Sequence, residues 1–256
     1  MHPRPMPRFR CTAILLWCIA AACAATAHAG SRVAQVEVHD RTAGEPLAVY
    51  RKFGERWIVG ERGHEYTIRV RNDSNARVLA VISVDGVNAV TGQTASPSQS
   101  GYVIEPGEYV TVEGWRKSLE RTAAFVFTTP SRAYAARTHR PDNIGVIGVA
   151  LFRERERYRV AAPAAETGDA QAAQRSAAKS AGPAAPSLGT GHGRSEYSPA
   201  QWTAFERESD TPSQVVVLRY ESRDSLMAMG VLPRERVPRR DRPDPFPAAF
   251  GFVPDP

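Results

Sequence analysis

The region from Val33 to Val160 alternates between short strand-like runs and clusters of turn residues. In VAQVEVH the apolar residues Ala34, Val36 and Val38 occupy every second position, which places them on one face of a β-strand. RVLAVISV is apolar on both faces, as expected for a central strand that is covered on both sides. The pattern predicts a mainly β domain, an antiparallel β-sandwich of jelly-roll type.

Turn residues between these runs have specific conformational preferences. Asp85-Gly86 lies between two apolar runs and predicts a type I′ turn, which requires positive φ at both central positions. We expect further hairpin turns at Thr91-Gly92 and Pro106-Gly107. The segment QTASPSQSGY is polar and long for a hairpin loop, so it is the first place to look for binding.

The N-terminus has the pattern of a secretory signal. Arg4, Arg8 and Arg10 precede the apolar run CTAILLWCIAAACAA, and AHA stands before Gly30. We interpret residues 1–29 as a signal peptide, with a retained membrane anchor and a lipoprotein acylated at Cys23 as alternatives. No later segment approaches the roughly 20 apolar residues that span a bilayer. The expected location is the periplasm or the outer membrane.

Removal of this signal changes the composition of the protein. All three cysteines (Cys11, Cys18 and Cys23) lie in it, so the mature chain has no residue for a disulfide, a zinc thiolate or a cysteine nucleophile. Three arginines also leave, and the formal charge of +6 falls to a nearly balanced value. The high pI is therefore no sign of nucleic acid binding, and we expect no nucleic acid partner.

Composition divides the mature chain into four parts. Residues 30–160 form the β-sandwich, and 161–190 are an Ala- and Pro-rich flexible linker for which a helix is the alternative. Residues 191–233 are predicted to be a small β-hairpin plus a short helix that docks on the sandwich. Its strands are EYSPAQWTAFERES and SQVVVLRYES, and its helix RDSLMAMGVL has Asp224 or Ser225 as N-cap. Residues 234–256 are a disordered tail rich in Pro and Arg.

The sequence offers no set of residues typical of an active site or a cofactor site. The mature histidines are His39, His64, His139 and His192, and none has a partner at metal-ligand spacing. There is no GxSxG nucleophile motif. GTGHG at 189–193 lacks the preceding strand and the Lys of a phosphate loop, and we interpret it as the flexible exit of the linker. We assign no catalytic residue, no metal and no cofactor.

Aromatic and basic residues gather in two predicted loops, GWRKS and YAARTHRPDN. Loops of this composition are common in binding surfaces. The structural alternative is that Trp115 and Tyr134 cap the core while Arg137 pairs with Asp142. The candidate ligand- or partner-binding residues are Tyr102, Trp115, Arg116, Tyr134, Arg137, Arg140 and His192.

Five segments carry a family resemblance: NDSNARVLAVISVDGVNAVTG, GYVIEPGEYVTVEGWRKS, YAARTHRPDNIGVIGVALF, GTGHGRSEY and SLMAMGV. In combination they resemble a set of uncharacterised conserved exported proteins of Gram-negative bacteria. The similarity covers the sandwich and the C-terminal element but not the linker or the tail. It implies a location in the cell envelope, and it implies no activity and no functional residue.

These features favour an exported non-catalytic envelope protein, a binding or structural module whose partner is an envelope protein or a glycan. A hydrolase or lyase acting on envelope polysaccharide is the first alternative, and it needs a groove that holds two acidic residues, or an acid with a His or Tyr, at catalytic separation. Its candidate acids are Asp85, Glu105, Glu108 and Glu113. The second alternative is a chaperone-like assembly factor that adds a strand to a partner.

Overall fold

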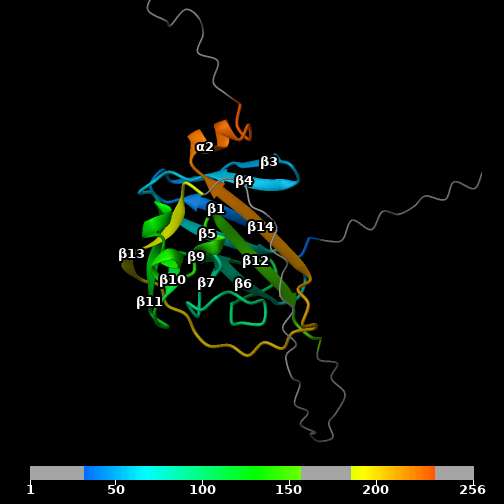
Figure 1. The fold of residues 1–256 in the computed structure, drawn as a ribbon. Helices are drawn as coiled ribbons and strands as arrows, with labels where there is room; N and C mark the ends of the chain where they lie inside the picture. The colour runs from blue at the N-terminus through cyan, green and yellow to red at the C-terminus, as the bar shows by residue number, and fades with distance from the viewer. Residues whose placement is uncertain (1–31, 157–185, 234–256) are drawn as a thin grey trace, which may run out of the picture. The chain divides into compact units, whose positions relative to one another are not determined.

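The computed structural model describes residues 32–156 and 186–233. They form two β-sheets that share one hydrophobic core, so the expected mainly β sandwich is confirmed (Figure 1). The expected signal peptide (1–29), most of the expected linker (161–190) and the expected tail (234–256) lie outside the described residues.

Each sheet has seven strands. Sheet A contains β1 (Ala34–Asp40), β2 (Glu45–Pro46), β5 (Glu65–Asn72), β9 (Tyr109–Val112), β10 (Gly114–Arg116), β11 (Arg121–Thr128) and β13 (Gly189–Tyr197). Sheet B contains β3 (Val49–Lys52), β4 (Glu55–Val59), β6 (Val78–Val84), β7 (Val87–Asn88), β8 (Tyr102–Ile104), β12 (Val146–Arg153) and β14 (Gln214–Glu221). The pairs are antiparallel except for β14 with β4, which is parallel. The helical segments are η1 (Pro130–Arg132), α1 (Tyr134–Arg137), η2 (Pro141–Asn143) and α2 (Arg223–Ala228).

Strand alternation sets which side chains reach the core. On β5, Tyr66, Ile68 and Val70 point inward and are fully buried, as their spacing predicts. On β6 both faces are buried, which confirms the prediction of a central strand. Its outward residues Leu79 and Val81 form a second apolar cluster with Phe152 of β12.

The C-terminal strands do not form the predicted hairpin. β13 pairs with β11 in sheet A, whereas β14 lies between β12 and β4 in sheet B. The segment between them, residues 198–213, crosses from one sheet to the other (Figure 1). Both strands contribute buried side chains, among them Thr190 and Tyr220. The C-terminal part is therefore integral to the sandwich and is not an element docked on its surface.

GTGHG forms the start of β13, where Gly189, Thr190 and Gly191 are buried, and it is not a flexible linker exit. A Cβ on Gly189 would stand 2.7 Å from Ala133 Cβ, and one on Gly193 would stand 2.7 Å from Val126 Cγ2. These glycines let β13 approach β11 and the loop before α1 closely, which is the common reason for glycine inside a strand. The glycines that suggest a flexible segment in the sequence are therefore required for tight packing.

Helix α2 covers one end of sheet B. Leu226 and Leu232 pack against Trp57 of β4 in a separate apolar cluster. The predicted helix is confirmed, but its N-cap is Ser222, whose side chain accepts a hydrogen bond from Ser225 N. Ser222 has the extended backbone typical of an N-cap, and the helix begins at Arg223. Asp224 and Ser225 therefore lie inside the helix.

The expected type I′ turn joins β6 to β7. Asp85 has φ 51° and Gly86 has φ 76°, and Val84 pairs with Val87 across the turn. The turn at Pro106-Gly107 is also present, with Gly107 at φ 75° and Glu108 N donating to Glu105 O. It does not close a hairpin, because β8 before it belongs to sheet B and β9 after it belongs to sheet A.

A buried hydrogen-bond network joins the two sheets around the Asp85 carboxylate. Its Oδ1 accepts hydrogen bonds from Tyr220 OH at 2.5 Å and Gly145 N at 3.0 Å, and its Oδ2 accepts one from Thr190 N at 2.7 Å. Thr190 Oγ1 lies 2.8 Å from Tyr220 OH and 2.6 Å from Tyr66 OH. These residues come from both sheets and from the turn between β6 and β7, so the network fixes how the sheets meet.

Burial has an electrostatic cost at this point. It raises the pKa of Asp85 to about 6, and the hydrogen bonds from Tyr220, Thr190 and Gly145 counteract part of that effect. The pKa values of Tyr66 and Tyr220 are also raised, first by burial and then by the nearby Asp85 charge. The tyrosines are therefore neutral donors at physiological pH.

We predict that Asp85→Asn destabilises the fold by about 2 kcal/mol, because both oxygens of a carboxyl group can accept hydrogen bonds even when it is protonated, whereas an amide has one acceptor oxygen and would face its NH2 group toward another donor. Asn tolerates the positive φ at this position, so the turn itself is kept. The folded pKa of Asp85 is raised, so its contribution to stability is largest below about pH 4 and falls as pH rises through about 6.

The destabilisation by Asp85→Asn should accordingly be larger near pH 4 than near pH 7, as measured by denaturant unfolding. Asp142→Asn, at an exposed acid on η2, is the matched control and should change little. Equal effects of Asp85→Asn at the two pH values would contradict the assignment.

Candidate functional site

Residues 198–213, the strap, run across the open edge of the sandwich from β13 to β14 (Figure 1). Backbone hydrogen bonds hold its first part to the loop after β10. Ser198 N donates to Glu120 O and Ala200 N to Leu119 O, both at 2.7 Å. The strap therefore starts as a continuation of the ladder between β11 and β13.

The second part of the strap is held to the end of β12. Arg155 N donates to Glu206 O at 2.8 Å, and Glu208 N donates to Arg153 O at 3.0 Å. Phe205 packs on the apolar cluster formed by the outward side chains of sheet B. The two anchored ends leave the middle of the strap, around Trp202, standing clear of the sheets, and the Trp202 side chain is 77% exposed.

A groove of about 1110 Å³ lies between the strap and the sandwich. Its apolar and aromatic lining includes Leu79, Tyr102, Val110, Leu119, Trp202 and Phe205. Its polar lining includes Ser98, Gln99, Arg116, Lys117, Ser118, Gln201, Glu206, Arg207 and Asp210. The groove thus combines exposed rings with hydroxyl, amide and charged groups, and the polar segment QTASPSQSGY supplies part of its wall.

Arg116 connects the wall of the groove to the strap. Its guanidinium lies 5.7 Å from the centre of the Tyr102 ring and donates to Tyr102 OH at 3.3 Å. It also donates to the carbonyl oxygens of Ser118 and Ser198. Burial raises the pKa of Tyr102 while the Arg116 charge opposes that rise. Two of the predicted site residues therefore meet in this groove.

Trp115 and Tyr134 form a wall on the other side of β10. Trp115 is buried, packs edge-on against Phe125 at 5.2 Å, and donates from Nε1 to Gly191 O at 3.3 Å. Tyr134 lies 4.9 Å from the Trp115 ring and 5.8 Å from the His192 ring. The contacts of Trp115 are those of a core residue, in line with the structural alternative.

Two more of the predicted residues, Arg137 and His192, line a second, smaller hollow, the β13 pocket. It has a volume of about 590 Å³ and is lined by Val126, Thr128, Ser131, Arg132, Arg137, Gly191, His192 and Gly193. Arg140 does not face it, because its guanidinium donates to Gly92 O at 3.0 Å and to Thr138 Oγ1 at 2.9 Å. Arg140 therefore holds the loop after α1 in place.

The expected pair of Arg137 with Asp142 does not form, since no ion pair of Arg137 occurs within the described ranges. The seven predicted residues therefore do not form one site. Tyr102 and Arg116 line the groove, and Arg137 and His192 line the β13 pocket. Trp115 and Tyr134 form the wall between them, and Arg140 holds the loop after α1.

Sequence reasoning missed Trp202 and the rest of the strap. The sequence pattern predicts one continuous strand over EYSPAQWTAFERES, with Trp202 inside it. Pro199 carries no backbone N–H for a ladder, so it was the available sign that the strand ends before this tryptophan.

The candidate acids of the hydrolase hypothesis do not share a groove. Asp85 is in the core, Glu105 and Glu108 are exposed in the turn between β8 and β9, and Glu113 is half-buried. Two other carboxylates, Glu206 and Asp210, line the groove. Glu206 forms an ion pair with Arg155, and Asp210 is exposed, so neither has the apolar surroundings typical of a catalytic general acid.

A histidine and an aspartate do meet elsewhere, at the end of β1. His64 Nδ1 lies 2.7 Å from Asp40 Oδ2, because β1 pairs with β5 and brings the two ends together. Asp40 also accepts the amides of Thr42 and Ala43. No hydroxyl is bonded to His64 within residues 32–156 and 186–233, and no cluster of three metal-ligating side chains occurs there either. The pair stabilises the turn after β1.

Comparisons with protein-family models, curated proteins and solved structures found no match. In the part of the chain that the structure describes, no helix has the length and apolar character required to cross a bilayer.

We predict that His64 makes stability depend on pH. Its bond to Asp40 raises the pKa of His64, whereas burial opposes ionisation of Asp40 but is outweighed by the bonds from Ala43, His64 and Thr42, which lower the pKa of Asp40. The stabilisation from protonated His64 is complete below about pH 6.5 and is lost as pH rises through the raised pKa.

The denaturation midpoint should therefore fall between about pH 6 and pH 8.5, and it should fall less in His64→Gln. His139→Asn is the control, because His139 is exposed and its φ of 61° suits Asn. An unchanged pH dependence in His64→Gln would contradict this role.

Proposed function

We propose that the protein is an exported, non-catalytic binding module of the cell envelope, and that its groove binds a glycan. The observation that carries the proposal is the exposed Trp202 ring on an anchored strap, in the same groove as Tyr102 and Arg116. An exposed tryptophan on an anchored segment is costly to leave in water and is a common anchor of binding surfaces.

The composition of the groove favours a sugar over a purely apolar ligand. A pyranose ring has apolar C–H faces and a hydroxyl rim, so it needs flat rings beside groups that donate and accept hydrogen bonds. Trp202 and Tyr102 supply the rings, and Gln99, Ser118 and Gln201 supply the polar groups. Arg116 and Lys117 add donors for sugar hydroxyls or acidic substituents.

The envelope location rests on the N-terminal sequence and on the family resemblance. The basic start, the apolar run and the AHA tripeptide support export, and the resemblance supports the periplasm or the outer membrane as the destination.

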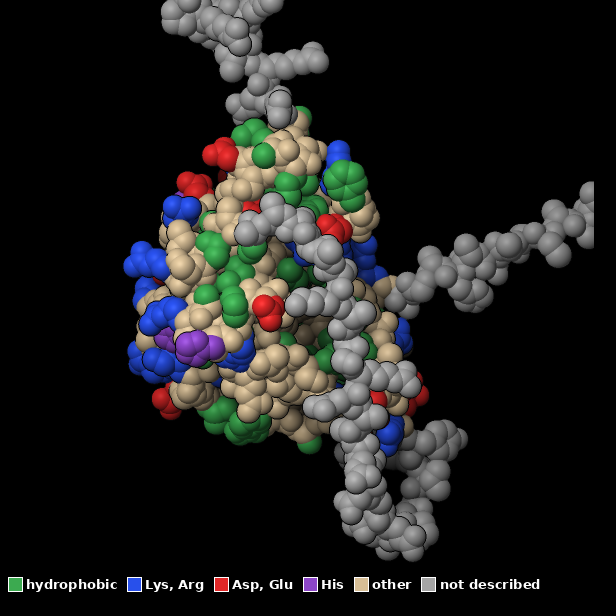
Figure 2. Space-filling model, in the orientation of Figure 1, with side chains coloured by type: hydrophobic (Ala, Val, Ile, Leu, Met, Phe, Trp, Pro, Cys, Tyr) green, Lys and Arg blue, Asp and Glu red, His purple; other side chains and the backbone are tan. Residues whose placement is uncertain are grey.

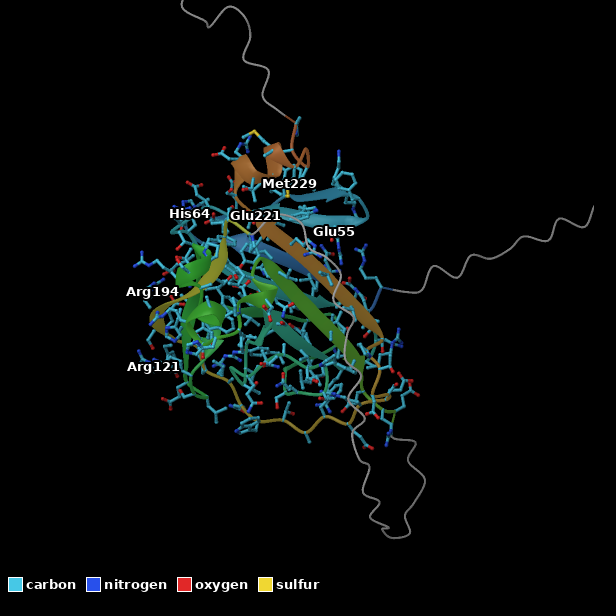
Figure 3. All side chains as sticks on the ribbon, in the orientation of Figure 1. Glu55, His64, Arg121, Arg194, Glu221 and Met229 are labelled. Atoms are coloured by element: carbon cyan, nitrogen blue, oxygen red, sulfur yellow. The ribbon has the colours of Figure 1, made fainter. Side chains whose placement is uncertain are left out.

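The strand-addition alternative is less well supported by the sheet edges. β13 is a long edge strand, but η1 and α1 pack along its first half. Its second half has a register shift opposite β11 and charged residues, Arg194 and Glu196. Arg194, labelled in Figure 3, pairs with Glu65 and Glu196, and Arg41 also pairs with Glu196. Charges and bulges of this kind discourage pairing with another chain.

We predict that Trp202→Ala weakens glycan binding about tenfold or more, because a stacked ring contributes roughly 1.5 kcal/mol. Binding is measured on immobilised oligosaccharides from peptidoglycan and from lipopolysaccharide. Phe53→Asn is the matched control, since it removes another exposed ring at a position with φ 53° that Asn tolerates. Equal retention of the wild type and Trp202→Ala would refute the groove assignment.

A second prediction concerns export. In a Gram-negative host the full chain should appear outside the cytoplasm with Gly30 as its first residue, and a chain lacking residues 2–29 should stay in the cytoplasm. Fractionation and N-terminal sequencing of the purified protein provide the measurement. Recovery of the uncleaved chain from the cytoplasm would contradict the signal-peptide interpretation.

A further inference from the structure

The β13 pocket has a lining rich in hydrogen-bond donors. Arg132 and Arg137 contribute guanidinium groups, Thr128 and Ser131 contribute hydroxyls, and His192 contributes a ring. None of the residues that line it has a carboxylate. A ligand in this pocket would therefore meet donors and positive charge, and the ligand suited to such a lining is an anion.

Within the described residues, no carboxylate forms an ion pair with the arginines of the pocket. Neither Arg132 nor Arg137 forms an ion pair with any residue in 32–156 or 186–233. The nearby Arg194, in contrast, pairs with Glu65 and Glu196. Figure 2 shows Lys and Arg side chains gathered with a histidine on the side of the molecule where α1 and β13 lie. Arg132 and Arg137 thus give this surface positive charge that no carboxylate in the described part of the chain neutralises.

The pocket is held by the fold around it. The loop that carries Arg132 and Arg137 is fixed by buried Ala133 and Ala135 and by the bond from Arg140 to Gly92 O. Gly191 and Gly193 flank His192 and have no side chain to fill the hollow. The backbone that carries these donors is therefore fixed before a ligand binds, which lowers the entropic cost of binding.

His192 responds to the same positive surroundings. Its pKa is lowered by burial first and then by the charges of Lys117 and Arg137. An anion placed among these groups would oppose the two charges and raise the pKa of His192 again. This gives a residue-specific readout of binding.

We propose that the β13 pocket binds a phosphate-type oxyanion through Arg132, Arg137 and the hydroxyls of Thr128 and Ser131. Guanidinium groups match phosphate oxygens in geometry and charge, and hydroxyl donors complete the remaining oxygens. The site goes beyond the proposed glycan groove, because it has different residues on the other side of the wall formed by Trp115 and Tyr134. The shared chemistry is a phosphoryl group, free or on a larger molecule.

The test is an NMR titration of the purified protein at constant ionic strength. Inorganic phosphate replaces chloride stepwise, and the ring signals of the four mature histidines are followed. Saturable movement of the His192 signals, with an upward shift of its pKa and with His39 and His64 unchanged, is the expected result. The proposal would be overturned if the His192 signals did not move. It would also be overturned if they moved in the same way when chloride was added without phosphate.

Variants locate the site. Arg132→Gln and Arg137→Gln should each weaken phosphate binding about tenfold, because each removes one charge-assisted contact. Arg51→Gln, at an exposed arginine on β3 of the other sheet, is the matched control and should bind as the wild type does. Unchanged affinity in the double variant Arg132→Gln/Arg137→Gln would place the anion elsewhere and refute the assignment.

Two further ligands separate the possible sources of the phosphoryl group. Glycerol 3-phosphate and vesicles containing phosphatidate are titrated beside inorganic phosphate, and acetate tests a planar carboxylate. Tighter binding of glycerol 3-phosphate or of the vesicles would identify a phosphorylated molecule as the ligand. Preference for acetate over every phosphate would contradict the proposed chemistry. Trp202→Ala should not alter any of these results, so failure of the glycan groove and failure of this site remain distinguishable.

Discussion

The fold depends on the buried carboxylate of Asp85. A charge removed from water is tolerated only when hydrogen bonds replace its hydration, and three donors do so here. Thr190 on β13 and Tyr220 on β14 are among them, so the same carboxylate anchors one strand of each sheet. Because those two strands are fixed in opposite sheets, the chain between them must cross the edge of the sandwich. The strap and its groove are consequences of that constraint.

The strands and their inward faces could be predicted from the sequence because alternation is a local property. Tyr66, Ile68 and Val70 face the core whatever strand lies next to them. Pairing between distant segments has no such local signature. The runs around Tyr197 and Val216 therefore suggested a hairpin from their proximity in sequence, whereas their partners are β11 in one sheet and β12 and β4 in the other.

The site shows the same division between local and long-range information. Tyr102, Arg116, Arg137 and His192 were identifiable from composition, since aromatic and basic residues on loops are typical of binding surfaces. Trp202 was not, because its exposure depends on where the strap is anchored. Asp85 was recognised as a turn residue but not as the centre of the core, since a type I′ turn is ordinarily on the surface.

Strand alternation on β10 explains why two different sites lie so close together. Trp115 points into the core, where it supports Tyr134 and the loop that carries Arg137, while Arg116 points into the groove and holds the strap. One three-residue strand thus separates a surface of rings and hydroxyl groups from a surface of unpaired positive charge. The two surfaces suit different chemical groups, and a ligand that carries both a sugar ring and a phosphoryl group would find a complement on each side of this strand.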